Sequence, residues 1–298
     1  MLLAARDEPG LLGPGPDRTM EEQVLEFLQI LWDNRLSWGT IQADTGMVRN
    51  IKLILEYNGT NYHGWQSQVT PRRDTPTIQE TLEQAIKTLT GEDIRTVSSG
   101  RTDAGVHALG HVAGFHTASR VPSEAFAPAL NHLLPPDIRV LSSEEAAPDF
   151  HARYSATGKI YRYLILNRAA PSALYRTCAW HVCQRLNLRA MRLAAGALLG
   201  KHDFSAFRSS ACAARTPVRT LRSLKIAKKA EFVEILLEAD AFLMHMARNI
   251  AGTLVETGLG RFSPSDVEEM LKSCERSKAG RTAPAHGLYL VKVHYPAK

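Results

Sequence analysis

The spacing of apolar residues predicts a strand, a helix and a second strand in the first part of the chain. Residues 51–57 (IKLILEY) are mostly apolar and end at an Asn-Gly turn, as a strand does. Residues 77–89 (TIQETLEQAIKTL) carry apolar side chains at helical spacing and stop before Gly91. A further strand is predicted around 110–117, and a glycine-rich loop separates it from the helix.

The rest of the chain predicts the same kinds of element. The expected strands and helices are strand 160–166 (IYRYLIL), helix 188–199, strand 232–237, helix 241–257 and strand 287–296. The helix at 241–257 is apolar almost all round, so we expect it to be largely buried.

The second part of the chain also repeats the first in order. Ile160 follows Ile51 by 109 residues, and Gly200 follows Gly91 by the same distance. The segment 215–217 (Arg-Thr-Pro) echoes 101–103 (Arg-Thr-Asp) at a separation of 114. A common order of matches indicates an internal duplication in which only the first copy keeps the acid.

We therefore predict an α+β fold made of two related α/β halves, residues 48–150 and 151–298. Each half is expected to be a mainly antiparallel sheet with helices on one face. Because only the first half keeps an Asp in the repeated loop, we expect one active site per chain, in the cleft between the halves.

Residues 1–47 form an acidic extension. Residues 1–19 are rich in Gly and Pro and are expected to be disordered, whereas 20–32 predicts a short amphipathic helix that begins after Thr19. Two interpretations stay open: the protein starts at Met47 and the extension is a mis-assigned leader, or the extension is an accessory segment.

Charge is spread unevenly between this extension and the rest. The chain has 36 basic and 30 acidic residues, of which three basic and eight acidic ones lie in 1–46. Residues 47–298 therefore hold 33 basic and 22 acidic residues. A basic body of this kind favours a polyanionic partner, above all nucleic acid.

Composition also bears on location and cofactors. The four cysteines (Cys178, Cys183, Cys212 and Cys274) form no C-x-x-C pair, as is typical of reduced thiols in a cytoplasmic protein. The chain shows no secretory signal and no apolar run of about 18 residues, so we expect no membrane segment. Phosphate-loop, nucleophile-elbow and zinc-helix motifs are missing, which predicts neither a nucleotide cofactor nor a metal.

The glycine-rich loop GRTDAG (100–105) is the main candidate for chemistry. Glycines allow close backbone approach, and Arg101 and Asp103 can both point into a cleft. Local sequence alone equally allows Asp103 to cap a turn. The nearby His107 and His111 are interpreted as structural, or as surface groups near RNA.

Two other features suggest a binding site. Aromatic and basic residues interleave in 150–165, and period 2 puts Tyr161 on one strand face with Lys159 and Tyr163. A tyrosine there is usually core, but it can also stack on an extruded base. Arg248 lies on the apolar helix 241–257, where it requires an acidic partner.

These motifs resemble the TruA family of tRNA pseudouridine synthases. The resemblance spans residues 48–298, and the matching blocks occur in family order: YNGTNYHGWQSQ, GRTDAGVHALGHVAGF, DFHARYSATGKIYRY, HDFSAF, ARTPVRT, FLMHMARNIAGTLVETG and GLYLV. It implies the pseudouridine-synthase type of the fold predicted above. Residues 1–47 have no counterpart in it, and His111 stands where many relatives have Gln.

The resemblance assigns roles by position. Asp103 matches the catalytic aspartate, Arg248 the arginine that pairs with it, and Arg101 the arginine that helps to extrude the target. Tyr161 matches the tyrosine that stacks on the target uracil, and Leu288 an apolar wall of the pocket. Whether Asp103 attacks the sugar, attacks carbon 6 of uracil or removes a proton stays open.

The implied activity is conversion of uridine to pseudouridine at positions 38, 39 and 40 of the tRNA anticodon stem-loop, without a cofactor. A cytoplasmic homodimer with tRNA as partner is expected. Breaking and rejoining the glycosidic bond requires neither redox chemistry nor phosphate energy. One alternative is an inactive tRNA-binding or folding module. Another, an Asp-dependent glycoside hydrolase, usually needs two acids, and no second acidic motif is found.

Overall fold

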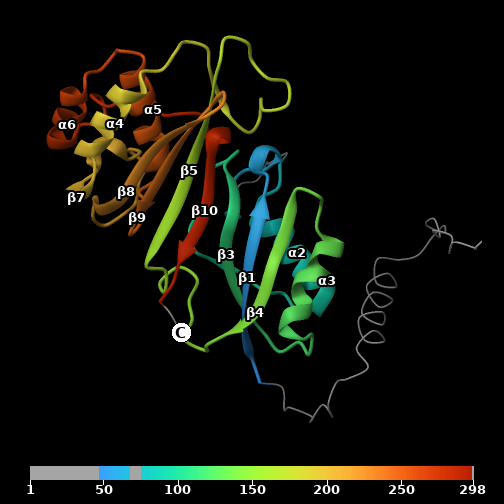
Figure 1. The fold of residues 1–298 in the computed structure, drawn as a ribbon. Coiled ribbons are helices and arrows are strands. Elements are labelled where there is room, and N and C mark those ends of the chain that lie inside the picture. Colours follow the sequence, from blue (N-terminus) through green and yellow to red (C-terminus); the bar gives the residue numbers. More distant parts are fainter. Residues whose placement is uncertain (1–46, 68–74, 297–298) are drawn as a thin grey trace, which may run out of the picture. The chain divides into compact units, whose positions relative to one another are not determined.

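One mixed sheet runs through the described part of the protein (Figure 1). The computed structural model describes residues 47–67 and 75–296. The disorder expected at 1–19 and the helix expected at 20–32 lie outside these ranges. All the described strands and helices belong to one compact unit, residues 46–298.

The described elements follow the predicted alternation of strands and helices. The strands are β1 (Arg49–Tyr57), β2 (Val97–Ser98), β3 (His107–Thr117), β4 (Ile138–Ala146), β5 (Gly158–Asn167), β6 (Trp180–Val182), β7 (Gly200–Asp203), β8 (Val218–Lys229), β9 (Phe232–Ala239) and β10 (Leu288–His294). The α-helices are α2 (Ile78–Thr90), α3 (Phe126–Leu133), α4 (Leu188–Ala197), α5 (Met246–Gly258) and α6 (Pro264–Ser273). Short 3-10 turns are η1 (Gly59–Asn61), η2 (Ser123–Ala125), η3 (Ser205–Phe207) and η4 (Ala285–Gly287).

The strand order shows the duplication directly. The sheet runs β4-β1-β3-β10-β5-β9-β8-β7, with β2 added beside β3 and β6 beside β5. The antiparallel trio β4-β1-β3 recurs as β10-β5-β9, so each trio has the earliest strand of its half at the centre. The two trios are joined where β10 pairs in parallel with β3. The strands of both halves therefore form one continuous sheet.

Helices flank the two ends of this sheet (Figure 1). Helices α2 and α3 lie beside β1, β3 and β4, whereas α4, α5 and α6 lie beside β7, β8 and β9. Side chains at alternate positions of β1 and β9 are fully buried, among them Ile51, Leu53, Ile235 and Leu237. This alternation is typical of strands with one covered face. The expected α+β fold of two similar halves is confirmed.

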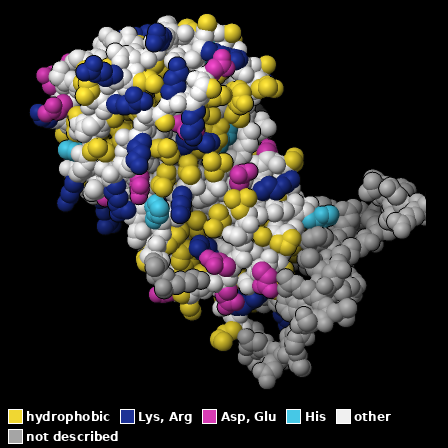
Figure 2. Space-filling model, viewed as in Figure 1, with side chains coloured by type: hydrophobic (Ala, Val, Ile, Leu, Met, Phe, Trp, Pro, Cys, Tyr) yellow, Lys and Arg dark blue, Asp and Glu magenta, His cyan; other side chains and the backbone are white. Residues whose placement is uncertain are grey.

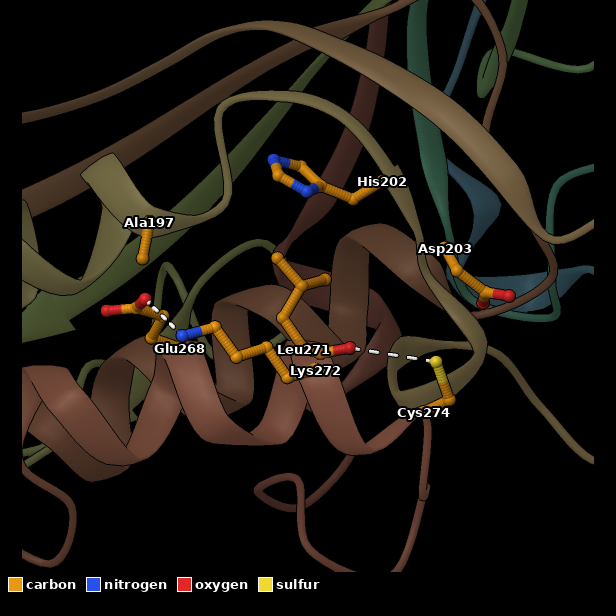
Figure 3. A pocket seen from close by; sticks show the side chains of 7 residues that line it. All are labelled: Ala197, His202, Asp203, Glu268, Leu271, Lys272 and Cys274. Carbon is orange, nitrogen blue, oxygen red and sulfur yellow. Dashed lines mark hydrogen bonds and ion pairs between the residues drawn. The ribbon is translucent and has the colours of Figure 1, made fainter.

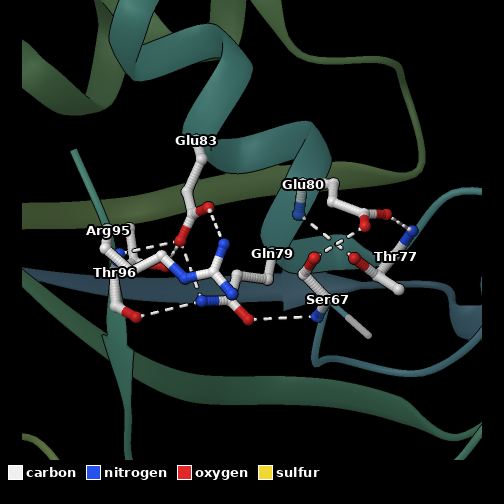
Figure 4. A network of polar contacts seen from close by, with 7 residues as sticks. All are labelled: Ser67, Thr77, Gln79, Glu80, Glu83, Arg95 and Thr96. Atoms are coloured by element: carbon white, nitrogen blue, oxygen red, sulfur yellow. Dashed lines mark hydrogen bonds and ion pairs between the residues drawn. The ribbon is translucent and has the colours of Figure 1, made fainter. Parts of the chain in front are cut away.

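Helix α2 begins where its capping residues predict. The Thr77 hydroxyl accepts a hydrogen bond from the backbone N–H of Glu80, whose carboxylate accepts one from Thr77 N–H in return. The Gln79 side-chain amide donates to the Thr96 carbonyl at 3.1 Å, and the Glu83 carboxylate accepts from the Thr96 N–H at 2.8 Å (Figure 4). These contacts tie α2 to the segment that leads into the glycine-rich loop.

Some elements begin later than predicted or were not predicted, for local reasons. Helix α5 begins at Met246 rather than at 241, because His245 before it has φ 64°, which lies outside the helical region. Strand β8 lacks a clear two-residue period because a bulge interrupts it between Leu221 and Ser223. Strand β4 is rich in exposed polar residues, as befits a sheet edge.

The echo between 101–103 and 215–217 does not correspond to matching places in the fold. The first segment lies between β2 and β3, whereas the second precedes β8. Because β8 pairs with β9 as β2 pairs with β3, the counterpart of the glycine-rich loop is the β8–β9 turn. The similarity of these two triplets is therefore no part of the structural repeat.

His107 and His111 are buried on β3, which supports their structural interpretation. His107 Nδ1 accepts from Gly59 N–H at 3.1 Å, and its Nε2 lies 3.0 Å from the Thr177 carbonyl. The His111 ring stacks on Trp65 with centroids 4.0 Å apart. Burial lowers the pKa of His111 to about 3, so this ring is neutral in the folded protein.

We expect His111→Gln to weaken the pH dependence of stability. An unfolded histidine binds a proton below its ordinary pKa of 6.5, whereas folded His111 does so only near about 3. The unfolded state therefore binds more protons between these values, and the free energy of unfolding falls as pH drops through them. Denaturant unfolding from about pH 7 to about pH 4 measures this slope. His116→Gln, an exposed site on the same strand, is the control and should keep it; an unchanged slope in His111→Gln would contradict the prediction.

Candidate active site

The loop Gly100–Gly105 is held by backbone contacts with the segment that follows β1. Trp65 N–H donates to the Thr102 carbonyl at 3.1 Å, and Val106 N–H donates to the Asp103 carbonyl at 3.1 Å. A Cβ on Gly64 would lie 2.5 Å from that Thr102 oxygen, so only glycine allows the approach. The loop that bears Asp103 is therefore fixed at its base.

A buried hydroxyl network supports the same loop. The Tyr57 hydroxyl lies 2.8 Å from Thr102 Oγ1 and 3.1 Å from His111 Nδ1. Burial raises the pKa of Tyr57 far above its ordinary value, so this phenol stays protonated and able to donate. The residue next to Asp103 is thereby linked to the core of the first half.

Asp103 and Arg248 form an ion pair, as their sequence positions suggested. Arg248 Nη1 lies 2.8 Å from Asp103 Oδ2, and their side chains are 15% and 28% exposed. The guanidinium is itself fixed, because its Nε donates to the Ala283 carbonyl at 2.8 Å. This partly buried pair joins a carboxylate of the first half to the Arg248 guanidinium on α5.

Close packing brings Ala283 to that position. A Cβ on Gly252 of α5 would collide with the backbone carbonyl of Arg281, and a Cβ on Gly280 would lie 2.8 Å from Thr253 Cα. These glycines let the segment 280–283 lie directly on the helix. The carbonyl of Ala283 then meets Arg248 Nε within hydrogen-bonding distance.

His245 is a third member of the site that the sequence analysis did not identify. Its Nε2 lies 3.4 Å from Asp103 Oδ2, the oxygen that Arg248 also contacts. His245 precedes α5 with φ 64°, a left-handed conformation that costs a non-glycine residue roughly 1 kcal/mol or more. Among the described residues, none hydrogen-bonds to Asp103 Oδ1. One carboxylate oxygen is thus held and the other is left for chemistry.

Tyr161 lies on β5 with its side chain largely buried, at 8% exposure. Its ring meets Phe242 edge to face with centroids 4.8 Å apart. Burial raises its pKa well above the ordinary value, and the negative charge of Asp103 raises it further. Tyr161 is therefore a protonated phenol near the carboxylate, with an orientation set by Phe242.

Leu288 and Arg101 are placed differently from this group. Leu288 begins β10 and is buried at 5% exposure, but it pairs with Tyr163, whereas Leu290 pairs with Tyr161. Arg101 is exposed and forms no hydrogen bond or ion pair with any described residue. The structure therefore brings together Asp103, Arg248, His245 and Tyr161, with Leu288 nearby in the sheet and Arg101 free to meet a ligand.

A hollow on the surface lies away from this group. It is lined by His202, Asp203 and Cys274 together with part of α6, where Lys272 and Glu268 pair at 2.6 Å (Figure 3). No residue of the Asp103 group lines it.

Within residues 47–67 and 75–296, no three His, Cys, Asp or Glu side chains are grouped to hold a metal ion. In the same ranges, no helix has both the length and the apolar character needed to cross a membrane.

The Asp103 group is suited to chemistry at a base and its sugar. A carboxylate oxygen without a partner can act as a nucleophile or base, while Arg248 holds the other oxygen in place. The phenol of Tyr161 offers a flat face beside it, on which a base can stack.

Comparison with known proteins identifies this combination. A sequence model of the family described as tRNA pseudouridine synthase matches the chain twice, over residues 53–155 and 194–296. Proteins named tRNA pseudouridine synthase A are similar to it: that of Acetivibrio thermocellus is 50% identical, that of Pelobacter propionicus 48% and that of Thermoanaerobacter sp. 46%. Each alignment covers 83% of this chain and 100% of the relative.

These matches confirm the resemblance to the TruA type and, with it, the expected class of enzyme, an isomerase of tRNA uridine. The first matched segment runs from β1 through β4 and the second from α4 through β10, and together they cover most of the chain. This chain belongs to the tRNA pseudouridine synthase family.

Proposed function

We propose that this enzyme converts uridine to pseudouridine at positions 38, 39 and 40 of the tRNA anticodon stem-loop, with Asp103 as its catalytic carboxylate. The observation that carries the proposal is the ion pair between Asp103 Oδ2 and Arg248 Nη1 at 2.8 Å, which leaves Oδ1 without a described partner. The names of the relatives supply the substrate class, tRNA.

The other residues have complementary roles in the proposal. Tyr161 stacks on the extruded uracil and keeps it close while the glycosidic bond is broken. Leu288 contributes to the apolar wall that keeps water away from the detached base. Arg101, exposed beside the carboxylate, enters the space that the extruded nucleotide leaves. Extrusion costs roughly a few kcal/mol, which contacts with the RNA backbone must offset.

Charge and architecture support an RNA substrate. Lys and Arg side chains gather on the visible face over the end of the sheet formed by β7, β8 and β9 (Figure 2). Such a surface attracts the phosphates of a stem-loop, and binding of RNA should weaken as the salt concentration rises.

We propose that residues 48–150 supply the carboxylate loop and that residues 151–298 complete the pocket. Three adjacent target positions fit recognition by shape rather than by base sequence.

The proposed assembly is a cytoplasmic homodimer in which one tRNA contacts both subunits. Sedimentation analysis with and without tRNA measures the number of subunits, and a monomer bound alone to tRNA would contradict the dimer.

Mapping pseudouridine in tRNA from a strain that lacks the gene, with and without a restored copy, tests the target positions. The alternative is a tRNA-binding or folding module without catalysis, and an assay of tritium release from uracil carbon 5 separates the two.

We expect Asp103→Asn to abolish pseudouridine formation and to leave tRNA affinity within a few-fold of the wild type. The amide has nearly the same shape but no negative charge, so it is neither nucleophile nor base. Tritium release measures turnover, and filter binding measures affinity. The control is Asp93→Asn, an exposed carboxylate paired with Lys87, which should stay active. A turnover of Asp103→Asn close to that of the wild type would refute the assigned role.

His245→Leu is expected to lower kcat by about 10- to 100-fold. His245 Nε2 lies 3.4 Å from Asp103 Oδ2, and a polar contact with a charged group is worth up to about 1.5–3 kcal/mol, whereas leucine offers no polar atom there. His245→Gln keeps a donor at a similar reach and should recover most of the activity. His245→Gly relieves the left-handed backbone but offers no donor, so it should be as slow as His245→Leu. Equal activity of the Leu and Gln variants would show that the side-chain contact does not matter.

A further inference from the structure

Lys159 is a partly buried lysine that the proposed reaction does not use. It lies on β5 two residues before Tyr161, so both side chains project from the same face of the strand. Among the described residues, no carboxylate forms an ion pair with it. A cation withdrawn from water without an acid beside it is costly, which suggests that its partner comes from outside the chain.

The contacts of Lys159 place its ammonium at the start of the Asp103 loop. Nζ donates to the Ser99 carbonyl at 2.7 Å, and it fills the space that a Cβ on Gly100 would occupy. An ammonium group has three N–H donors, and this is its one hydrogen bond to a described residue. Two donors therefore remain for a ligand.

Positive charge gathers around this ammonium. Burial, and to a smaller extent the neighbouring charge of Arg153, lower the pKa of Lys159 to about 8. On β3 it faces His111, which is neutral, and in the sheet its neighbours are Ala239 of β9 and Val293 of β10. The elements packed around Lys159 thus contribute a second cation, and the Asp103 carboxylate on the neighbouring loop pairs with Arg248 instead of with Lys159.

We propose that Lys159, assisted by Arg153, binds the backbone phosphate of the target nucleotide. This rests on the proposed function, because Tyr161 must hold the uracil. Residues two apart on a strand are separated by about 7 Å, which matches the span from a stacked base to its own phosphate. A phosphodiester supplies the missing negative charge and accepts from the free N–H donors.

The same contact couples RNA binding to the position of Asp103. Lys159 holds the Ser99 carbonyl with one donor and the phosphate with another, so the phosphate is fixed relative to the loop Gly100–Gly105. The ribose between the uracil and the phosphate is then fixed at both ends. Its reacting carbon is presented to Asp103 in one orientation, which favours reaction.

The first test compares Lys159→Met and Lys159→Arg. Methionine keeps a long apolar stem without charge, and we expect KM to rise by about tenfold or more, while arginine stays within a few-fold of the wild type. The slope of log Kd against log salt concentration should fall by about 0.7–0.9 in Lys159→Met, as for one lost phosphate contact. Lys87→Met, an exposed lysine on α2, should change neither quantity.

A modified substrate identifies the phosphate. Stem-loop RNAs with an uncharged methylphosphonate on the 5′ or the 3′ side of the target uridine remove one negative charge at a time. For one of them, Lys159→Met should bind no more weakly than the wild-type protein, because the contact is already lost. If the Met substitution weakens binding of both modified RNAs as much as that of normal RNA, the phosphate assignment is wrong. Binding measured with Asp103→Asn protein does not depend on turnover, so this result is separable from a failure of the proposed activity.

A pH profile provides an independent check. The wild-type kcat/KM should fall above about pH 8 as free Lys159 loses its proton, and Lys159→Arg should lose this fall. Of the groups near Lys159, Tyr161 has its pKa raised far above this window and His111 has its pKa lowered to about 3, so neither of them changes charge near pH 8. Ionisation of the substrate uracil affects the wild type and Lys159→Arg alike, so it does not account for a difference between their pH profiles. The same alkaline fall in both would overturn the proposal, as would a Lys159→Met variant that lowers kcat with unchanged KM and salt slope.

Discussion

The ion pair between Asp103 and Arg248 is the constraint on which the site depends. A charge withdrawn from water requires a partner, and here each partner belongs to a different half of the sheet. Neither half alone therefore supplies both the Asp103 carboxylate and its partner. The pair also divides the carboxylate between structure and chemistry, because Arg248 and His245 meet at Oδ2 and leave Oδ1 open.

Much of the surrounding architecture keeps this pair in register. Glycines allow the backbone to approach the loop on one side and α5 on the other, where larger residues would hold the segments apart. Contacts through Thr102 and Ala283 then fix Asp103 and Arg248 separately. Preorganisation of this kind lowers the reorganisation needed when the substrate arrives. In this view the glycine-rich motifs are as necessary to the chemistry as the charged residues.

The sequence predicted those parts whose causes are local. The cap of α2 and the strand β1 follow from short patterns, and the physical requirement for an acid near Arg248 is visible from its apolar helix. His245 was missed because the apolar pattern of 241–257 runs through it unbroken, whereas its left-handed backbone places it outside the helix. The insertion of β10 between β3 and β5 was equally invisible, because strand pairing over such separations leaves no local signal.

The joint between the halves has a consequence for how the protein is made. Parallel pairing of β10 with β3 links only Tyr289 with His107 and Leu290 with Ala108, and β10 comes later in the chain than every other described element. Folding during synthesis proceeds from the N-terminal side. A nascent chain can therefore build both partial sheets and still lack the strand that unites them. The continuous sheet can form only after β10 has been synthesised and has paired with both β3 and β5.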